Sequence, residues 1–200
     1  MTDVVLREMG LRDGLQSLKT FMPTAAKCAW ISAEAAAGVA EIEVTSFVPP
    51  KLLPQFADAE AVVAHALAIP GLRVAALIPN LRGAERGIAL GVHKLNYVLS
   101  VSESHNQSNV GRSTQESVDD FSRIVAAVRA APNRPWLCAG LATSFGCTFE
   151  GAVDEGRVRR IAVALAEAGA DEIALADTVG YGDPAAVRRL FAAVKHDVGA

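Results

Sequence analysis

An arginine and an aspartate stand side by side near the start of the chain, as Arg12-Asp13 before Gly14. A carboxylate is a hard oxygen ligand of the kind that Mg²⁺ or Mn²⁺ prefers. A guanidinium can stabilise an oxyanion while negative charge develops on it. The pair therefore indicates metal-assisted chemistry that passes through an oxyanion. A plainer interpretation is an ion pair that only holds a loop in place.

Polar side chains also follow the other short apolar runs of the sequence. In chain order they are Glu43, Thr45-Ser46, Asn80, Ser100, Ser102, Ser104, Thr143-Ser144 and Asp177-Thr178. In a barrel of parallel strands, the active site lies at the carboxyl ends of several strands. This distribution therefore predicts one site that is assembled from many strand ends.

The apolar runs alternate with longer segments of helical period. Strands are expected at residues 4–6 (continuing to Glu8), 41–44, 73–78, 94–99, 136–139 and 172–175. Helices are expected at residues 24–37, 57–68, 81–90, 114–130, 154–168 and 184–196. Glycines between a helix and the next strand, as at Gly91 and Gly169, can adopt the left-handed conformation that ends a helix. Such an alternation indicates βαβ units and a parallel sheet.

Two parallel architectures compete for this pattern. A doubly wound open sheet would favour a glycine-rich phosphate loop after the first strand, but residues 8–14 match neither GxGxxG nor a Walker loop. Polar residues at many strand ends favour a (β/α)8 barrel, which typically needs eight strands and about 250 residues. The 200 residues end after the sixth predicted helix. We therefore predict a single α/β domain over residues 1–200, a TIM-type barrel truncated to about six βα units with two open sheet edges.

Composition excludes several classes of function. The chain has 19 Lys+Arg against 22 Asp+Glu and no basic cluster, which argues against nucleic acid or a membrane surface as a partner. No apolar run approaches the roughly 18 residues of a membrane span, and no targeting peptide is visible. The chain has an odd number of cysteines, Cys28, Cys138 and Cys147, and no CxxC motif. This disfavours a disulfide framework or a zinc site and fits a reducing cytoplasm.

Longer motifs resemble those of the hydroxymethylglutaryl-CoA lyases, within the metal-dependent lyase and Claisen-condensing barrel superfamily. In chain order they are RDGLQ, E-x-TSFV-x-PK-x-x-PQ-x-AD, PNL-x-G, S-x-SES, FGC-x-x-EG and DT-x-G, from Glu8 to Gly182. RDG is shared across the superfamily, whereas TSFV-x-PK-x-x-PQ and FGC are particular to the lyase branch. The resemblance implies metal-dependent retro-Claisen cleavage of a 3-hydroxy-3-methylglutaryl-CoA-like thioester to acetyl-CoA and acetoacetate or a related 3-oxo acid.

The resemblance also implies roles for individual residues. Arg12 is expected to stabilise the enolate of the leaving acetyl-CoA, and Asp13 to bind Mg²⁺ or Mn²⁺. Glu43 is expected to orient the metal shell or the arginine, and Asp177 to lie near the substrate hydroxyl. Contacts with the acyl-CoA substrate are expected from Gln16, Ser46, Asn80, Ser102, Ser104 and Thr143.

Several of these residues have a plainer interpretation. Glu43 could pair with a basic residue of the barrel, and the serine-rich segment 100–108 could be a solvated loop rather than the substrate entrance. Asp177 could cap the next turn. Cys147 is expected to pack in the core rather than to act as a nucleophile.

The family pattern extends past residue 200, to an H-x-H pair on the seventh strand and a cysteine and Asn on the eighth. We therefore expect little lyase activity from the 200-residue chain alone. One alternative is an inactive chain whose open edges pair with another copy, forming a homo-oligomer, or with a separate C-terminal fragment. Another is a synthase that condenses acetyl-CoA with a 2-oxo acid, or an aldolase. Ser17-Leu18-Lys19 after Gln16, like Phe149 and Pro49-Pro50, departs from the family pattern and points to a bacterial side branch whose acyl substrate need not be hydroxymethylglutaryl.

Overall fold

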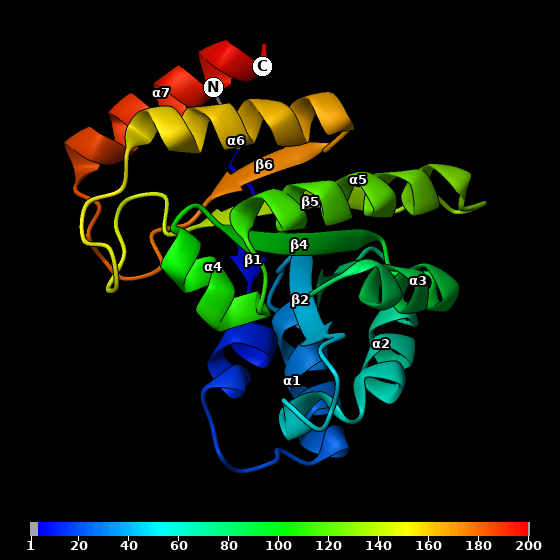
Figure 1. The fold of residues 1–200 in the computed structure, drawn as a ribbon. Coiled ribbons are helices and arrows are strands. Elements are labelled where there is room, and N and C mark those ends of the chain that lie inside the picture. The colour runs from blue at the N-terminus through cyan, green and yellow to red at the C-terminus, as the bar shows by residue number, and fades with distance from the viewer. Residues whose placement is uncertain (1–3, 200) are drawn as a thin grey trace. The chain divides into compact units, whose positions relative to one another are not determined.

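The computed structural model describes residues 4–199, in which strands and helices alternate along the chain (Figure 1). The strands are β1 (Arg7–Glu8), β2 (Glu41–Ser46), β3 (Arg73–Ile78), β4 (Lys94–Ser100), β5 (Trp136–Ala142) and β6 (Glu172–Leu175). The helices are α1 (Thr24–Ala36), α2 (Ala59–Leu67), α3 (Leu81–Leu90), α4 (Glu103–Val110), α5 (Thr114–Ala130), α6 (Glu155–Ala168) and α7 (Pro184–Val198). A π-helical turn, η1 (Gly10–Gly14), and a 3-10 turn, η2 (Pro54–Phe56), complete the elements.

The chain divides into two compact units, and β4 runs from one into the other. The first unit comprises the residues up to Asn96 together with Ala130–Trp136. The second comprises Tyr97–Arg129 and the residues from Leu137 onward. Strands follow sequence order within each unit, and the β1–β2, β2–β3 and β5–β6 pairs are parallel. The predicted βαβ alternation is confirmed.

Strand β2 is the best-buried element of the first unit, because β1 and β3 pair with it on either side. All six of its residues are buried, polar ones included. The register against β3 shifts between Glu43 and Thr45, and such an irregularity changes the direction in which neighbouring side chains point. Helix α2 packs against β2 and β3, and α3 packs against β3.

Helix α3 approaches β4 closely because residue 87 has no side chain. A Cβ atom built on Gly87 would lie 2.5 Å from a methyl carbon of Leu95 and 3.1 Å from the Phe47 ring. Residue 91 ends the helix in the left-handed conformation, with φ of 78°. The predicted glycine cap at Gly91 is thus confirmed, as is the one at Gly169 after α6.

The second unit has its own core around helix α5. Phe121, Ile124 and Val128 are buried on α5, and the Tyr97 ring lies 5.5 Å from the Phe121 ring. The Tyr97 hydroxyl donates a 2.9 Å hydrogen bond to the carbonyl oxygen of Ser117. Helix α6 packs against β6 and α7. This core therefore combines apolar burial with a satisfied buried hydroxyl.

Two expectations about secondary structure are wrong. Residues 4–6 do not form a strand, since Val4, Val5 and Leu6 are 69–81% exposed and pairing with β2 begins only at Arg7. The serine-rich segment is not a loop, because α4 begins after Ser102, whose Oγ accepts the backbone N–H of His105. Apolar residues alone do not make a strand without a partner, and a polar helix lacks the periodicity that would reveal it.

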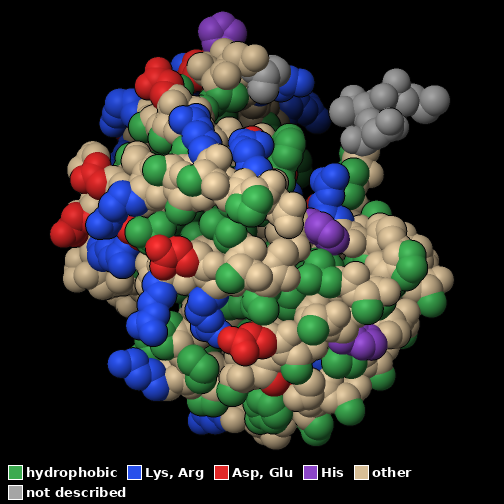
Figure 2. Space-filling view, turned by 90° about the vertical axis from the view of Figure 1, so that its right-hand side faces the viewer, with side chains coloured by type: hydrophobic (Ala, Val, Ile, Leu, Met, Phe, Trp, Pro, Cys, Tyr) green, Lys and Arg blue, Asp and Glu red, His purple; other side chains and the backbone are tan. Residues whose placement is uncertain are grey.

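The surface carries charges of both signs. On the face shown in Figure 2, cationic and anionic side chains are interspersed among hydrophobic ones. No helix within residues 4–199 is both long enough and apolar enough to span a membrane.

Candidate functional site

The turn η1 places Arg12 in the interior of the first unit. The residue is 9% exposed, and its backbone N–H bonds to the carbonyl oxygen of Met9. Glycine is required two residues earlier, because a Cβ atom on Gly10 would lie 2.7 Å from a Glu8 carboxylate oxygen and 2.8 Å from the Trp30 ring. The Glu8 carboxylate accepts the Gly10 N–H. These contacts fix the turn that carries the arginine.

Arg12 is held by two carboxylates. Its Nε donates to Oε2 of Glu43 at 2.5 Å, and its Nη1 donates to Oδ1 of Asp13 at 2.8 Å. Glu43 is fully buried, whereas the Asp13 side chain is 68% exposed. This ion pair agrees with both interpretations of Glu43, a plain pair with a basic residue and a carboxylate that orients the arginine, and both charges of the buried pair are compensated.

Asn96, on β4, completes this arrangement and was not predicted from the sequence. Its Nδ2 donates to Oε1 of Glu43 at 2.7 Å, so each oxygen of that carboxylate accepts one hydrogen bond. The signal in the sequence is an asparagine inside the predicted strand 94–99, where an apolar residue is expected. We call Arg12, Asp13, Glu43 and Asn96 the arginine cluster.

The arginine cluster fits a divalent cation only in part. Asp13 offers an exposed carboxylate, which suits one oxygen ligand. The Glu43 oxygens are both engaged by donors. In the described part of the chain, no three His, Cys, Asp or Glu side chains are grouped closely enough to hold a metal ion. One ligand position does not make a metal site, since Mg²⁺ prefers six.

The other site residues predicted in the first unit bind backbone groups or lie nearby. Oγ of Ser46 accepts the N–H of Val48 at 3.2 Å, where β2 ends. Oδ1 of Asn80 accepts the N–H of Gly83 at 3.0 Å and so caps α3. Gln16 is half-buried just past η1. Their contacts with substrate stay predictions.

Thr143 connects three strand ends of the second unit. Its Oγ1 accepts the N–H of Ser102 after β4, and its own N–H donates to the Thr178 hydroxyl after β6. Its backbone has φ of 59°, the only positive value among the described non-glycine residues. A β-branched residue is rarely found in this conformation. Thr143 thus acts first as a backbone tether, and its contact with substrate stays a prediction.

Asp177 caps the turn after β6. Its two oxygens accept the N–H groups of Tyr181 and Gly182, at 2.9 and 3.0 Å. The plainer interpretation, a turn cap, is confirmed, and a role near the substrate hydroxyl stays a prediction. Ser104, also predicted to contact substrate, is exposed and donates its backbone N–H to Glu150 at 2.7 Å.

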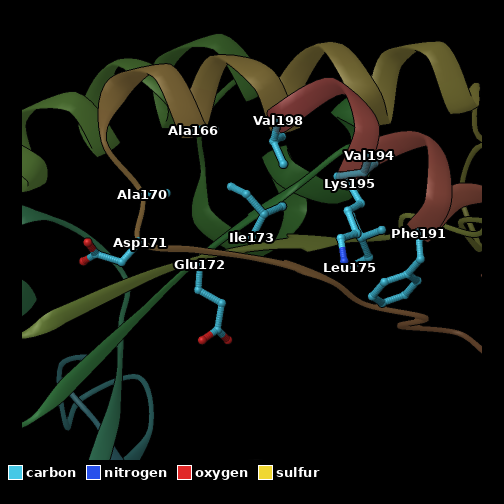
Figure 3. Close-up of a pocket in the computed structure, with 10 residues that line it drawn as sticks. All are labelled: Ala166, Ala170, Asp171, Glu172, Ile173, Leu175, Phe191, Val194, Lys195 and Val198. Carbon is cyan, nitrogen blue, oxygen red and sulfur yellow. The ribbon is translucent and has the colours of Figure 1, made fainter. Parts of the chain in front are cut away.

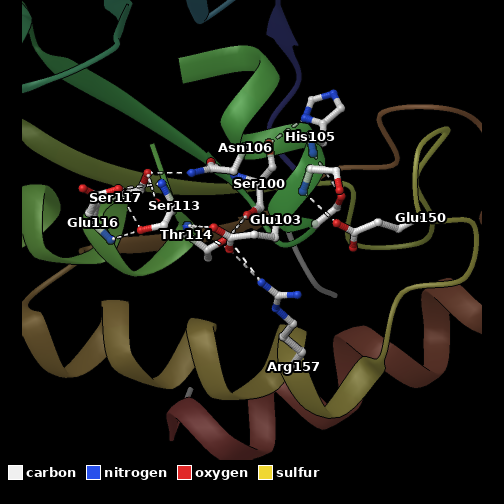
Figure 4. A network of polar contacts seen from close by, with 12 residues as sticks. Ser100, Glu103, His105, Asn106, Ser113, Thr114, Glu116, Ser117, Glu150 and Arg157 are labelled. Atoms are coloured by element: carbon white, nitrogen blue, oxygen red, sulfur yellow. Dashed lines mark hydrogen bonds and ion pairs between the residues drawn. The ribbon is translucent and has the colours of Figure 1, made fainter. Parts of the chain in front are cut away.

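A polar network fastens α4 and α5 to the end of β4 (Figure 4). Fully buried Asn106 accepts the Ser100 N–H at 2.8 Å and donates to the Ser117 hydroxyl at 2.8 Å. Glu103 accepts the N–H of Thr114 and a 3.2 Å bond from Arg157. The predicted entrance segment is therefore a helix held at both ends.

Cys147 packs in the core of the second unit, as expected, with no exposed surface. Burial raises the pKa of its thiol, but hydrogen bonds from the Ser102 side chain and from the backbone of Glu150 and Phe149 lower it, and the net pKa lies below its usual value. Its sulfur accepts the Phe149 N–H at 3.3 Å.

An apolar groove of about 340 Å³ runs between β6 and α7 in the second unit (Figure 3). Ile173 and Leu175 line it from β6, and Phe191, Val194 and Val198 line it from α7. The Phe191 side chain is 48% exposed. Among the described residues, β6 is the last strand in the sheet order, so this groove lies beside the last strand.

Comparison with known proteins gives a consistent result. The family model described as HMGL-like matches residues 3–200. The mitochondrial hydroxymethylglutaryl-CoA lyase of Rattus norvegicus is 36% identical over 195 residues, which cover 98% of this chain and 59% of that protein. A second relative is the 3-hydroxy-3-isohexenylglutaryl-CoA/hydroxymethylglutaryl-CoA lyase of Pseudomonas aeruginosa, which is 37% identical over 195 residues. This match covers 98% of this chain and 64% of that protein. The chain thus spans about three fifths of the length of these relatives.

A solved structure agrees with the fold. An HMG-CoA lyase from Acinetobacter baumannii, in complex with coenzyme A and 3-methylmalate, superposes with a TM-score of 0.91 at 34% identity. The match covers 98% of this chain and 65% of that one. The predicted fold class, a TIM-type barrel represented by six βα units, is confirmed.

Proposed function

The chain belongs to the HMGL-like family, and on this basis we propose that it carries the N-terminal part of the active site of a carbon–carbon lyase. The reaction is the cleavage of a 3-hydroxy-3-methylglutaryl-CoA-like thioester to acetyl-CoA and acetoacetate, or a related 3-oxo acid. The observation that carries the proposal is the buried pair of Arg12 and Glu43 beside Asp13. These residues belong to the motifs through which the chain resembles the lyases.

The proposed role of Arg12 follows from its fixed position. When the carbon–carbon bond breaks, negative charge develops on the thioester oxygen as the enolate forms. A donor stabilises that charge most when it needs no rearrangement during the reaction. Glu43 and Asp13 engage Nε and Nη1 of the guanidinium, and we assign the remaining Nη2 group to the thioester oxygen.

The proposed cofactor is a divalent cation, Mg²⁺ or Mn²⁺. When bound, it would polarise the substrate hydroxyl and carboxylate. Asp13 would supply one oxygen ligand, because its side chain is 68% exposed. The resemblance to the lyases implies that the other ligands would be an H-x-H pair and an asparagine on later strands of the family pattern.

The proposed substrate is a CoA thioester of a 3-hydroxyglutarate that is substituted at carbon 3. The Pseudomonas relative is named for both an isohexenyl and a methyl substrate, and the Acinetobacter structure contains coenzyme A. We therefore propose that the substituent at carbon 3 is either a methyl group or a longer chain, and an assay with both substrates decides between them.

An assay that separates cleavage from condensation tests this proposal. Residues 1–200 would be joined to the C-terminal part of the Pseudomonas relative and supplied with Mg²⁺ or Mn²⁺. The proposal expects acetyl-CoA to form from 3-hydroxy-3-methylglutaryl-CoA or its longer analogue. Consumption of acetyl-CoA with a 2-oxo acid, without thioester cleavage, would support a synthase instead.

A further inference from the structure

Asn96 occupies an unfavourable position for an asparagine. It lies within strand β4, between buried Leu95 and buried Tyr97, and is itself only 6% exposed. Asparagine is depleted in strands, and a buried amide needs partners for its carbonyl as well as its amino group. Something specific must therefore favour this residue here.

The asparagine has one strong bond and one orphaned atom. Its Nδ2 donates to Oε1 of Glu43 at 2.7 Å. Its Oδ1 is buried and accepts no hydrogen bond from the described residues. A buried polar atom without a partner is destabilising, so the bond to Glu43 is the interaction that accounts for the residue.

The orientation of this amide follows from chemistry. Rotating it by half a turn would bring Oδ1 against Oε1 of Glu43, and two acceptors repel each other. Only the amino group can face the carboxylate. Oε1 of Glu43 therefore accepts a hydrogen bond from the Asn96 amino group, while Oε2 accepts one from Arg12 Nε.

We propose that Asn96 is a positioning residue, which holds the Glu43 carboxylate so that Glu43 in turn orients Arg12. With a donor on each oxygen, the carboxylate cannot rotate about its last bond without losing a hydrogen bond. The Arg12 Nε–H group then has a fixed acceptor, and the guanidinium plane is fixed with it. This inference rests on the proposed function for its catalytic meaning, but the positioning itself does not.

The side-chain NMR signal of Arg12 tests the positioning without any turnover. In the ¹⁵N-labelled full chain, the Nε–H signal of Arg12 is identified by its loss in Arg12→Lys. We expect this proton to exchange with water far more slowly than that of exposed Arg82, by about 10-fold or more. Equal exchange at both arginines in the unsubstituted protein would overturn the proposal.

Two substitutions remove the donor in different ways. Asn96→Leu has a similar volume and removes the orphaned oxygen as well, and Asn96→Asp keeps the shape but replaces the donor by an acceptor. We expect both to shift the Arg12 Nε–H signal and to speed its exchange, whereas Asn133→Asp, at an exposed position of the same unit, leaves it unchanged. Should Asn96→Asp not fold, Asn96→Leu carries the comparison. A lower melting temperature with an unaltered Arg12 signal would show a structural role only.

A kinetic comparison separates this inference from the proposed function. In the chain joined to the C-terminal part of the Pseudomonas relative, we expect Asn96→Leu to lower kcat by about 10-fold or more with little change in KM. No cleavage by the unsubstituted protein, together with an altered Arg12 signal in Asn96→Leu, would reject the function and keep the positioning. Full kcat in the variant would reject the positioning role in catalysis.

Discussion

Arg12 and Glu43 form a buried ion pair, with Nε of the arginine 2.5 Å from Oε2 of the glutamate and side chains only 11% and 1% exposed. The pair joins the turn after β1 to the middle of β2. A buried charge that loses its partner is strongly destabilising. The pair therefore links the stability of the first unit to the geometry of the candidate active site.

Removing the Glu43 charge should destabilise the protein. We expect Glu43→Gln to lower the free energy of unfolding by about 3 kcal/mol, because Arg12 would keep a buried positive charge without a buried counter-ion. Urea denaturation measures this loss. The matched control is Glu60→Gln, whose ion pair with Arg86 is exposed at 3.5 Å and should contribute about 0.5 kcal/mol or less. Equal losses for both variants would contradict the account.

The backbone at Thr143 should reverse the usual preference for alanine over glycine. With φ of 59°, alanine is strained by about 1 kcal/mol and glycine is not. We expect Thr143→Gly to be more stable than Thr143→Ala by about 1 kcal/mol, although both lose the bond from the Ser102 N–H. At Thr45, inside β2, the order should be the ordinary one, with alanine the more stable.

Ionisation of Tyr97 should weaken the fold at high pH. Burial, assisted by the charge of Asp120, raises the pKa of this phenol to about 12. The folded state therefore holds the proton more tightly than the unfolded state, whose tyrosines have a pKa of about 10. The resulting stability is complete below pH 10 and is lost as the pH rises towards 12.

Tyr97→Phe should remove this part of the pH dependence. Urea midpoints measured between pH 9 and 12 should fall less steeply in Tyr97→Phe than in the unsubstituted protein. Tyr181→Phe, at a side chain that is 55% exposed, should change nothing. An identical slope in Tyr97→Phe would show that the phenol ionises without affecting folding.

The groove between β6 and α7 should favour self-association of the chain. Exposed apolar surface beside the last strand of a sheet tends to pair with another chain. We expect Phe191→Lys, at the rim of the groove, to shift the protein towards the monomer in size-exclusion chromatography with light scattering. Phe149→Lys, at a side chain that is 61% exposed elsewhere in the same unit, should not. A stable monomer before substitution would contradict this expectation.

Much of the fold follows from local patterns, but the contacts within the arginine cluster do not. Strand β3, helices α3 and α5, and strand β6 have the predicted bounds, because apolar spacing and glycine caps act over a few residues. The sequence pattern does not predict helix α4, because this helix has no apolar face. Hydrogen bonds of Asn106 and Ser102 hold it in place instead. The partnership of Asn96 with Glu43 spans 53 positions, and no local pattern specifies such a pair.

The site residues show the same division. The ion pair between Glu43 and Arg12 is present and agrees with both interpretations of Glu43. Asn80 and Asp177 engage backbone N–H groups through their side-chain oxygens, which the residue type alone indicates as a capping role. A polar residue at a strand end can act on a substrate or cap a backbone turn. The local backbone geometry decides between these roles, and the residue type alone does not reveal it.

The cleavage rate of Arg12→Lys tests the central claim most directly. It should be measured in residues 1–200 joined to the C-terminal part of the Pseudomonas relative, with Mg²⁺ or Mn²⁺ and with exposed Arg82→Lys as the control. If Arg12 stabilises the enolate, the unsubstituted protein and Arg82→Lys should release acetyl-CoA from 3-hydroxy-3-methylglutaryl-CoA or its longer analogue, and Arg12→Lys should be slower by about 100-fold or more in kcat. Equal rates for the two variants would contradict the account.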